Sequence, residues 1–496
     1  GLAMSNLSEL LPAGGGGKEV DFVASGTLPN GKPVILKTNG QVEVVAGSSL
    51  SKSVPAATPV IFNSSGNAYY VHVSFDPTNA NKFVMAYRDV GTGNRGTAII
   101  GTISNTSLSF GSEYVFEYNP TAEIAVKFAT NIANKFVVVF QHSGNSQRLQ
   151  GIVGTVSGTS ISYGSLSQAM SDSNIYDIDM DMDPGVTGRF AVVYRASQNN
   201  QRGQVIIGTV SGTSLSWGNE ATYKGSYAYY GKIRYISSNK FLIAYRNQTS
   251  QQANNTGMAR VGSVSGTSIS YGTDTTFHSG ATNAIGMDVD VSGAAVISYR
   301  NDVGSAYTGQ VLIANVSGTS VSFSAPTQFH GPMASGATSC DPNNAGTFVL
   351  AFSDNSNSYA KLAIGSFSGT TITMGTTHTV DTYGEYYGVD FDPQGTGKFV
   401  VGYSGPSSKG KAAVGQLESA DTNLTTTNFL GTSTEAYTNG QTATIALQGG
   451  ISTNQTSLTI GSTYYVQVNG TLATTPDLVS VEAGKAISAT SLILKG

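Results

Sequence analysis

The chain has 496 residues, of which 26 are Lys or Arg and 30 are Asp or Glu, so its formal net charge is −4. Only 11% of the residues are charged, against about 25% in an average soluble domain. This low charge argues against a protein that binds nucleic acid over a large surface, and no stretch has the roughly 20 apolar residues needed to cross a bilayer. The single cysteine, Cys340, excludes an intrachain disulfide and every multi-cysteine zinc site.

Residues 1–57 precede a repeat and are predicted to form an N-terminal attachment segment with short strands. Gly14 to Gly17 predict a flexible joint. The stretch VDFVASGTLPNGKPVILKTNGQVEVV contains Asn-Gly pairs at Asn30 and Asn39, which predict turns between two or three strands. The first residues have neither the basic nor the apolar region of a secretory signal, so we expect another route if the protein acts outside a cell.

Residues 58–430 contain a repeat of roughly 50 residues. An aromatic residue closes an apolar run at Tyr87, Phe140, Tyr194, Tyr245, Tyr299, Phe352 and Tyr403. A small residue opens the next run at Gly101, Gly154, Gly208, Gly262, Ala314, Gly365 and Gly415. Because the two markers recur equally often, we infer seven repeats.

Short runs of β-branched and aromatic residues predict four strands in each repeat. Residues 178–218 show the pattern as IDMDMDP, GRFAVVYR, GQVIIGTVS and SLSWG, bounded by turn residues, and no window has the spacing of an amphipathic helix. Four strands in about 50 residues are typical of a propeller blade. The sequence therefore predicts an all-β fold, a seven-bladed β-propeller over residues 58–430 with small β-rich modules at both ends. A linear β-solenoid is the alternative.

The start of the repeat region is expected to close the ring. Residues 58–70, with the sequence PVIFNSSG, resemble the outer strand of a blade and are expected to pair with blade 7. A closed ring also removes exposed sheet edges.

The connections between strands are predicted to form two different rims. Asp-Pro turns and SGTS-like turns fall on one rim because the strands alternate in direction, and both are short and uniform. The connections on the opposite rim vary, as in RDVGTGNRG, QHSGNSQRLQ and RNQTSQQANNTG. Binding residues usually lie on variable loops over a regular scaffold, so we call this rim the variable face and expect the function there.

Acidic residues alternate along the innermost strand of blade 3, at Asp177, Asp179, Asp181 and Asp183, so their carboxylates are expected on one side of that strand. Two hypotheses follow. In the first, acidic side chains at corresponding places form a Ca²⁺ site in the central channel, with the candidate ligands Asp179, Asp181, Asp288, Asp290 and Asp390. In the second, the carboxylates are turn caps or ion-pair partners of the basic residues Lys127, Lys232 and Arg234.

Tyrosines are concentrated before the blades on the variable face. Their rings suit a sugar or a partner protein, and arginines just after the repeat aromatic are expected to lie near them and to contact acidic groups. The predicted ligand-binding residues are Tyr176, Tyr227, Tyr229, Tyr230, Tyr383, Tyr386, Tyr387, Arg88, Arg195, Arg246 and Arg300. The alternative is that the tyrosines fill blade interfaces and the arginines extend over the rim.

Signals for catalysis are weaker. The five histidines fall in different blades, with none at metal-ligand spacing, and no GxSxG, HExxH or phosphate-binding loop occurs. The repeated turn lacks the Asp and Trp that propeller sialidases carry there. Asp381 and Glu385 are the carboxyl pair that glycoside hydrolysis would use on the variable face. We predict that the protein is not an enzyme and keep a polysaccharide-degrading propeller as the alternative.

Residues 431–496 are predicted to be a small C-terminal β module, and they carry a resemblance. The stretches Tyr464 to Gln467, Gly470 to Leu472 and Ala483 to Ala486, with SATSLILK after them, resemble small modules in tail-fibre and other virion proteins of tailed bacteriophages, including phages of marine cyanobacteria. The N-terminal sequences SELLPAGGGG and ASGTLPNGKPVILKTNG are similar to segments of the same proteins. The resemblance implies a protein of the virion surface, extracellular when mature, with other virion proteins and copies of itself as partners.

Together these patterns predict a structural virion protein of the tail-fibre type. Its propeller is expected to display a receptor-binding face for host adhesion, with a surface polysaccharide or receptor as the partner. No nucleic acid, membrane insertion or cofactor is expected, apart from the Ca²⁺ hypothesis. A purely structural fibre or decoration subunit, with its tyrosines at subunit contacts, is a further alternative.

Overall fold

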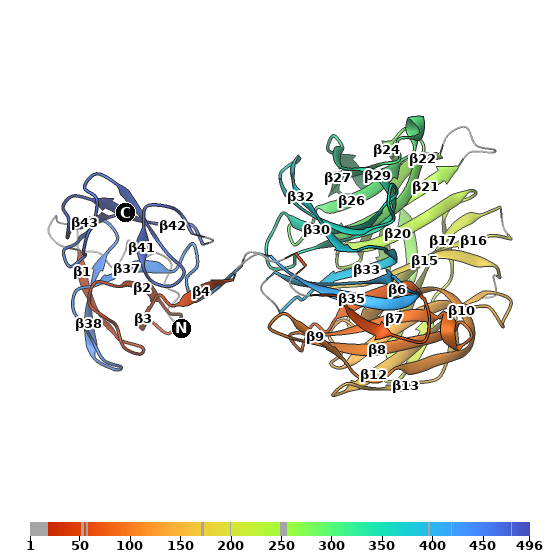
Figure 1. The fold of residues 1–496 in the computed structure, drawn as a ribbon, viewed down its shortest axis with the longest axis horizontal. Coiled ribbons are helices and arrows are strands. Elements are labelled where there is room, and N and C mark those ends of the chain that lie inside the picture. Colours follow the sequence, from red (N-terminus) through yellow and green to blue (C-terminus); the bar gives the residue numbers. More distant parts are fainter. Residues whose placement is uncertain are drawn as a thin grey trace. The chain divides into compact units, whose positions relative to one another are not determined.

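The computed structural model describes residues 18–50, 54–55, 58–169, 173–198, 200–248, 255–394, 397–417, 419–477 and 479–496. The expected joint at Gly14 to Gly17 lies outside these ranges. The chain divides into two compact units, residues 53–416 and residues 1–52 with 417–496 (Figure 1). In the described ranges, no helix is long and apolar enough to span a membrane.

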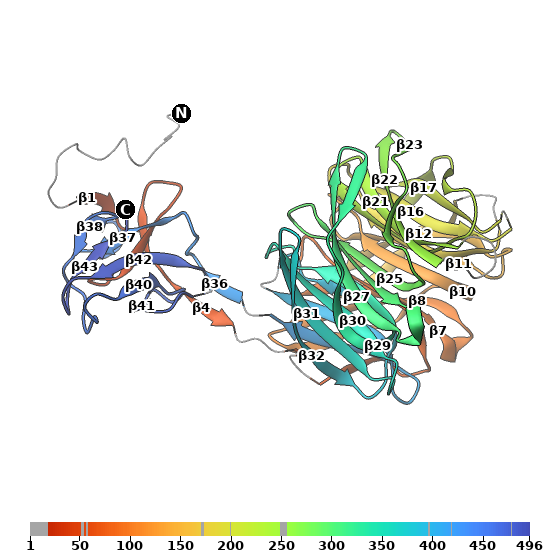
Figure 2. The same cartoon turned by 90° about the horizontal axis from the view of Figure 1, so that it is seen from above.

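The described part of unit 53–416 contains seven antiparallel blades, each with four main strands, seen from two directions in Figures 1 and 2. Blade 1 consists of β6 (Ala68–Phe75), β7 (Lys82–Asp89), β8 (Arg95–Ser104) and β9 (Ser107–Phe110). Blade 2 consists of β10 (Tyr114–Phe128), β11 (Lys135–His142), β12 (Arg148–Ser157) and β13 (Ser160–Tyr163). Blade 3 consists of β15 (Ile175–Met182), β16 (Arg189–Ala196), β17 (Arg202–Ser211) and β18 (Ser214–Trp217).

The next three blades follow the same order. Blade 4 consists of β20 (Ala228–Ser237), β21 (Lys240–Gln248), β22 (Asn255–Ser265) and β23 (Ser268–Tyr271). Blade 5 consists of β25 (Thr282–Val289), β26 (Ala295–Asn301), β27 (Thr308–Ser317) and β28 (Ser320–Phe323). Blade 6 consists of β29 (Thr327–Cys340), β30 (Thr347–Asp354), β31 (Ala360–Ser368) and β32 (Thr371–Asp381).

Blade 7 consists of β33 (Glu385–Phe391), β34 (Lys398–Gly405) and β35 (Lys409–Gln416), with β5 (Val60–Asn63) as its fourth strand. Small elements complete the unit: β14 (Ser167–Gln168), β19 (Ala221–Lys224), β24 (Thr275–His278) and the 3-10 helices η2 (Val90–Thr92) and η3 (Val303–Ser305). The strands β10 and β29 are long because each pairs first with the preceding blade and then forms the inner strand of its own.

The ring is closed by a strand that precedes blade 1 in the sequence. In the β5–β35 pair, Ile61 lies opposite Lys411 and Asn63 lies opposite Gly410. The backbone amide of Phe75 in blade 1 also donates a hydrogen bond of 2.8 Å to a carboxylate of blade 7. The expected pairing with blade 7 is confirmed for Val60–Asn63, whereas the end of the predicted range, residues 68–70, belongs to β6 of blade 1. The all-β, seven-bladed propeller is confirmed.

The small residue in each repeat has a packing reason. Gly154 lies opposite Phe136 on the neighbouring strand, and a Cβ atom at Gly154 would lie 2.1 Å from the Phe136 ring. The ring therefore occupies the space that a side chain would need. In blade 5 the corresponding pair is Ala295 and Ala314, where no ring is present and a methyl group fits. The repeat marker is thus one half of a cross-strand pair.

The hydrophobic core of the propeller lies between adjacent blades. Val139 of blade 2 and Val192 of blade 3 belong to one buried cluster, and Ala259 of blade 4 packs with Ile285 of blade 5 in another. Each blade buries its faces against its neighbours. This arrangement leaves the inner strands around the axis free to carry polar side chains.

The structure divides the chain differently from the predicted segments 1–57, 58–430 and 431–496. In the terminal unit, β1 (Glu19–Val23) pairs with β38 (Thr442–Leu447), and β2 (Pro33–Leu36) pairs with β37 (Phe429–Ser433). The two ends therefore form one unit, and residues 417–430 belong to it. The reason is that β5 supplies the fourth strand of blade 7, so the chain leaves the propeller after β35.

In its described residues, the terminal unit has two further sheets. Its remaining strands are β3 (Val42–Val44), β4 (Gly47–Leu50), β36 (Ser419–Thr422), β39 (Ile451–Ser452), β40 (Thr463–Val466), β41 (Leu472–Ala473), β42 (Val481–Ala486) and β43 (Leu492–Leu494). Segments that resemble phage virion modules contribute strands from both ends of the chain.

Phe62 is the residue of β5 that we expect to stabilise ring closure most. Its side chain is buried, and its ring lies 4.9 Å from that of Tyr87 and 5.9 Å from that of Phe110. Phe62→Ala leaves a cavity, so it should lower the free energy of unfolding of the propeller by about 3 kcal/mol. Denaturant unfolding measures the loss, and Ile61→Ala, at a neighbouring side chain that is 49% exposed, should cost less than about 0.5 kcal/mol. Equal losses in both variants would contradict this role for β5.

Candidate functional site

Acidic side chains on the inner strands join each blade to the next. An inner strand pairs with its own blade along one edge only, so amides on the other edge need another acceptor. The amide of Tyr235 in blade 4 donates to Asp181 of blade 3 at 2.8 Å. The amide of Cys340 in blade 6 donates to Asp288 of blade 5 at 2.7 Å. These inter-blade bonds satisfy backbone groups that no strand can reach.

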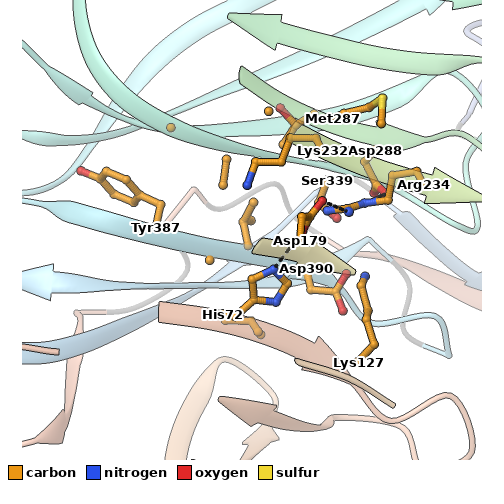
Figure 3. A pocket seen from close by; sticks show the side chains of 17 residues that line it. His72, Lys127, Asp179, Lys232, Arg234, Met287, Asp288, Ser339, Tyr387 and Asp390 are labelled. Atoms are coloured by element: carbon orange, nitrogen blue, oxygen red, sulfur yellow. Dashed lines mark hydrogen bonds and ion pairs between the residues drawn. The ribbon is translucent and has the colours of Figure 1, made fainter. Parts of the chain in front are cut away.

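The five candidate calcium ligands are not grouped around a common point. Among the residues that the structure describes, no three Asp, Glu, His or Cys side chains are placed to hold a metal ion. Asp179 accepts instead from the Arg234 guanidinium at 2.7 Å, as Figure 3 shows. Asp290 accepts from the amide of Gly346 at 2.7 Å, and Asp181, Asp288 and Asp390 accept from the amides described above. The structural hypothesis, with basic partners from other blades, fits these contacts.

Burial and charge shift two of the axial carboxyl groups in opposite directions. Burial opposes the ionisation of Asp179, but Arg234 and Lys232 outweigh it and hold the pKa of Asp179 well below its ordinary value. Burial raises the pKa of Asp390 to about 6, and the nearby Lys127 offsets only part of that effect. We call Lys127, Asp179, Lys232, Arg234 and Asp390 the axial cluster. Its charges come from four blades and largely compensate one another.

On the variable-face side of the axial cluster, the channel widens into a cavity of about 620 Å³. All seven inner strands have a β-bulge at this level, where the register shifts after Tyr69, Ala122, Tyr176, Tyr229, Asn283, Met333 and Glu385. At six bulges a residue other than glycine has φ between 47° and 56°: Tyr70, Glu123, Asp177, Tyr230, Ala284 and Tyr386. Bulges re-aim side chains, and such backbone strain is concentrated at binding sites.

We call the first residue after each register shift a member of the mouth ring, and all of these residues line the cavity: Tyr70, Glu123, Asp177, Tyr230, Ala284, Ala334 and Tyr386. In blade 6, Ser335 follows Ala334 and lines the cavity as well. Their chemistry changes around the ring. Blades 2 and 3 contribute the carboxyl groups, blades 5 and 6 contribute the small residues, and blades 7, 1 and 4 contribute the tyrosines. The mouth ring therefore has an acidic side, a small-residue side, and tyrosines on the two walls between them.

Arginines hold the tyrosines of blades 3 and 4 in a continuous stack. The guanidinium of Arg195 lies 4.9 Å from the ring centroid of Tyr176 and 4.5 Å from that of Tyr229. The guanidinium of Arg246 lies 4.7 Å from the centroid of Tyr229 and 4.8 Å from that of Tyr230. Cation–π attraction of this kind holds each ring against its neighbouring guanidinium and so restrains the tyrosine side chains.

A second stack joins blades 7 and 1. The guanidinium of Arg88 lies 4.9 Å from the ring centroid of Tyr69 and 5.1 Å from that of Tyr70. The ring of Tyr69 lies 4.4 Å from that of Tyr386. The predicted proximity of arginines and tyrosines on the variable face is therefore observed in both stacks.

The arginines have partners within the protein. Arg195 donates to Asp177 at 2.6 Å, and Arg300 donates to Asp302 at 2.6 Å while lying over Tyr307. We therefore assign Arg88, Arg195, Arg246 and Arg300 to positioning the tyrosines. The expectation that they contact acidic groups holds for Arg195 and Arg300, whose acidic partners belong to the chain itself, whereas Arg246 donates to Asn283 and Gln248.

The predicted tyrosines differ in how they face the cavity. Tyr230, which is 38% exposed, lines the cavity with Tyr386 and Tyr387. Tyr387 is the most constrained of these, because its hydroxyl lies 3.2 Å from the Ser353 hydroxyl. Of the predicted tyrosines, Tyr230 and Tyr386 offer the best-placed rings for a ligand.

The remaining predicted tyrosines lie outside the cavity lining. Tyr176 and Tyr229 are enclosed in the first stack, and the hydroxyl of Tyr176 donates to Gln147 at 3.2 Å. Tyr227 is 36% exposed at the rim. Burial and a hydrogen bond to Glu385 raise the pKa of Tyr383 to about 12. The structure thus separates cavity residues from supporting residues, which the sequence grouped together.

Two carboxyl groups of the mouth ring were not predicted as site residues. Asp177 was placed in the acidic row of blade 3, but the bulge after Tyr176 brings it to the cavity, where it pairs with Arg195. Glu123 accepts from the amide of Asp177 at 3.0 Å, and burial together with the Asp177 charge raises the pKa of Glu123 to about 7. Aligning the repeats on Tyr70 would have identified both positions.

The carboxyl pair considered for glycoside hydrolysis is divided between two environments. Glu385 lines the cavity. Asp381 accepts from Lys411 at 2.9 Å and from the hydroxyl of Tyr403 at 3.1 Å, and it is not part of the cavity lining. The acidic groups that do share the cavity with Glu385 are Glu123, Asp177 and Asp354.

Comparison with known proteins supports the fold. No protein-family model matches the chain, and no curated protein matches it significantly. Among solved structures, the BP39L lectin from Burkholderia pseudomallei has a TM-score of 0.53 and 10% identity, covering 72% of this chain and 98% of the lectin. The β-propeller domain of the Trilobed protease from Pyrococcus furiosus has a TM-score of 0.40 and 8% identity, covering 71% of this chain and 97% of that domain. At this identity, the likeness to the lectin shows a shared propeller fold.

The ion pair of Asp179 and Arg234 tests the axial cluster. Asp179→Ala leaves the buried Arg234 without its nearest partner, so the free energy of unfolding should fall by about 3–5 kcal/mol. Combining it with Arg234→Met removes both charges and should recover part of this loss. Denaturant unfolding of the single and double variants should give an interaction energy above about 0.5 kcal/mol. Strictly additive effects would show that the two side chains do not depend on each other.

Proposed function

We propose that this protein is a non-enzymatic, carbohydrate-binding β-propeller whose variable face binds a glycan on a host surface. The observation that carries the proposal is the cavity that the mouth ring lines, which we call the mouth cavity. Its volume of about 620 Å³ falls in the range of small-ligand sites, about 300–1,000 Å³. Tyrosine rings supply apolar faces for sugar rings, and carboxylate and amine groups supply partners for sugar hydroxyls.

The fold is compatible with this function. The BP39L lectin shares this fold with a TM-score of 0.53, so the fold is one that a lectin has. At 10% identity, no site residue of the lectin can be assigned to a position in this chain.

We propose that the protein belongs to a bacteriophage virion, as a tail-fibre-type component. The support is the resemblance of the two ends to phage virion modules, together with the finding that both ends build one unit separate from the propeller. In this proposal, the terminal unit contacts other virion proteins or copies of the chain. The propeller is then left to meet the host surface outside the cell.

A second function, polysaccharide hydrolysis, is favoured by one observation. Glu123, with its pKa raised to about 7, lines the same cavity as Asp177, which is ion-paired with Arg195. Glycosidases use a carboxylic acid and a carboxylate whose pKa values differ. The Glu123 carboxyl is already bonded to the amide of Asp177, which favours a structural role and makes binding the first proposal.

Substitution of the cavity tyrosines tests glycan binding. A glycan array identifies a bound glycan, and calorimetry then measures its affinity for the wild type, Tyr230→Ala and Tyr386→Ala. Each loss removes a ring from the cavity wall, so each variant should bind at least tenfold more weakly. Tyr118→Ala is the matched control, because Tyr118 is 70% exposed and does not line the cavity, and it should bind like the wild type.

Other results would select the alternatives. Unchanged binding in both cavity variants would contradict the assignment of the site, and no binding to any host glycan would contradict the function. Release of new reducing ends from host polysaccharide would establish the hydrolase. Large assemblies in which the tyrosines are protected from solvent would favour a structural subunit.

A further inference from the structure

The mouth cavity is open toward the variable face, and it narrows along the channel toward the axial cluster. The axial space below it is only about 70 Å³ and is lined by the axial cluster and His72. This space has room for water molecules but not for a sugar ring. A glycan chain therefore cannot pass through the propeller along its axis. Only the end of such a chain can fill the cavity.

The charged groups in the cavity favour a ligand without formal charge. Among the described residues, three lining side chains have no ion-pair partner within 4.0 Å: Lys232, Glu123 and Glu385. The other charged lining residues are already paired, Asp177 with Arg195, Asp354 with Lys361 and Arg300 with Asp302. One such cation among two such acids gives neither an anionic nor a cationic ligand a clear advantage, because the charge of Lys232 already acts on Asp179 and Glu123 from beyond 4.0 Å. Sugar hydroxyls, in contrast, can use both the donor and the acceptors.

Lys232 is placed to bond with a ligand. It lies on β20, two residues after Tyr230, and lines both the cavity and the narrow axial space. Its side chain extends into that space (Figure 3), while the neighbouring Asp179 is engaged by Arg234. A lysine ammonium has three donors, and no hydrogen-bond acceptor for them is found in the described part of the chain.

We propose that the mouth cavity binds the terminal sugar of a neutral glycan, one chain end per propeller, with Lys232 and Glu385 bonding to its hydroxyls. Tyr230 on blade 4 and Tyr386 on blade 7 stand on opposite walls and pack against its ring. The side chain of Ser335, on the small-residue side, is small enough to leave room for the sugar. This inference rests on the proposed glycan-binding function and adds the position, the ligand class and the stoichiometry.

The test uses the full chain and an array of single sugars, neutral and acidic, displayed on one linker. We expect at least one neutral sugar and no acidic sugar to be bound, with calorimetry giving one site per chain. Ser335→Trp fills the cavity from its small side and should weaken binding at least tenfold. Lys232→Met keeps the length of the side chain, removes the donors and should weaken it similarly. Ser157→Trp, at an exposed turn on the opposite rim, is the matched control and should bind normally.

The outcomes separate this inference from the function on which it rests. Glycan binding that survives Ser335→Trp, or several sites per chain, would overturn the axial position while leaving carbohydrate binding in place. Binding of acidic sugars alone would overturn the neutral class. If the wild type binds no immobilised sugar and no host polysaccharide, the proposed function itself fails. Thermal unfolding of each variant confirms that the propeller is folded.

Discussion

The hydrogen bond that a backbone amide of one blade donates to a carboxylate of the preceding blade is the contact on which this propeller depends. Inner strands of adjacent blades do not form a common sheet, so their axial amides have no strand partner. Asp181, Asp288 and Asp390 supply the acceptors between blades 3 and 4, 5 and 6, and 7 and 1. The bonds across the closing junction are of the same kind as those within the ring, so closure uses the repeat's own chemistry together with β5.

These bonds also explain why the site lies at the variable face. Below the bulges, the inner strands are tied blade to blade, and the axial cluster closes the channel. At the bulges, the strands depart from regular pairing, and residues such as Glu123 and Tyr230 are held at positive φ. The stacks of Arg88, Arg195 and Arg246 on tyrosines then limit the motion of the rings. A cavity with a rigid base and fixed walls loses little entropy when a ligand binds.

The fold could be predicted from the sequence because the residues that recur in each repeat are those that pack against each other across neighbouring strands. Each Phe–Gly pair recurs, and its replacement by Ala295 and Ala314 keeps the same fit, so the count of blades could be read directly. The outer strand in residues 58–70 was recognisable because it continues the same pattern. The shared terminal unit was not, because pairing between β1 and β38 joins residues more than 400 positions apart, as in Glu19 with Ala446.

Only part of the site could be predicted, because the bulges interrupt the alternation of side chains along the inner strands. Strict alternation placed Asp177 with Asp179 and Asp181, but one extra residue in the strand moves Asp177 to the mouth ring. The same signal suggested a row of metal ligands, whereas the backbone amides of the next blade take those carboxylates. Tyr230 and Tyr386 were identified because tyrosines on a variable rim are visible in the sequence. Lys232 was predicted only as a counter-ion. The lack of a hydrogen-bond acceptor for its ammonium group could be seen only in the packed structure.

Hydrogen exchange, measured amide by amide, shows whether the bonds between blades protect the axial amides. The amides of Tyr235, Cys340 and Phe75 lie on strand edges without a strand partner, yet each donates to a carboxylate of the preceding blade. We expect these amides to exchange as slowly as amides in the middle of the same sheets, and equally slowly with a metal chelator present. Rapid exchange at these positions, or protection that disappears with the chelator, would contradict this expectation.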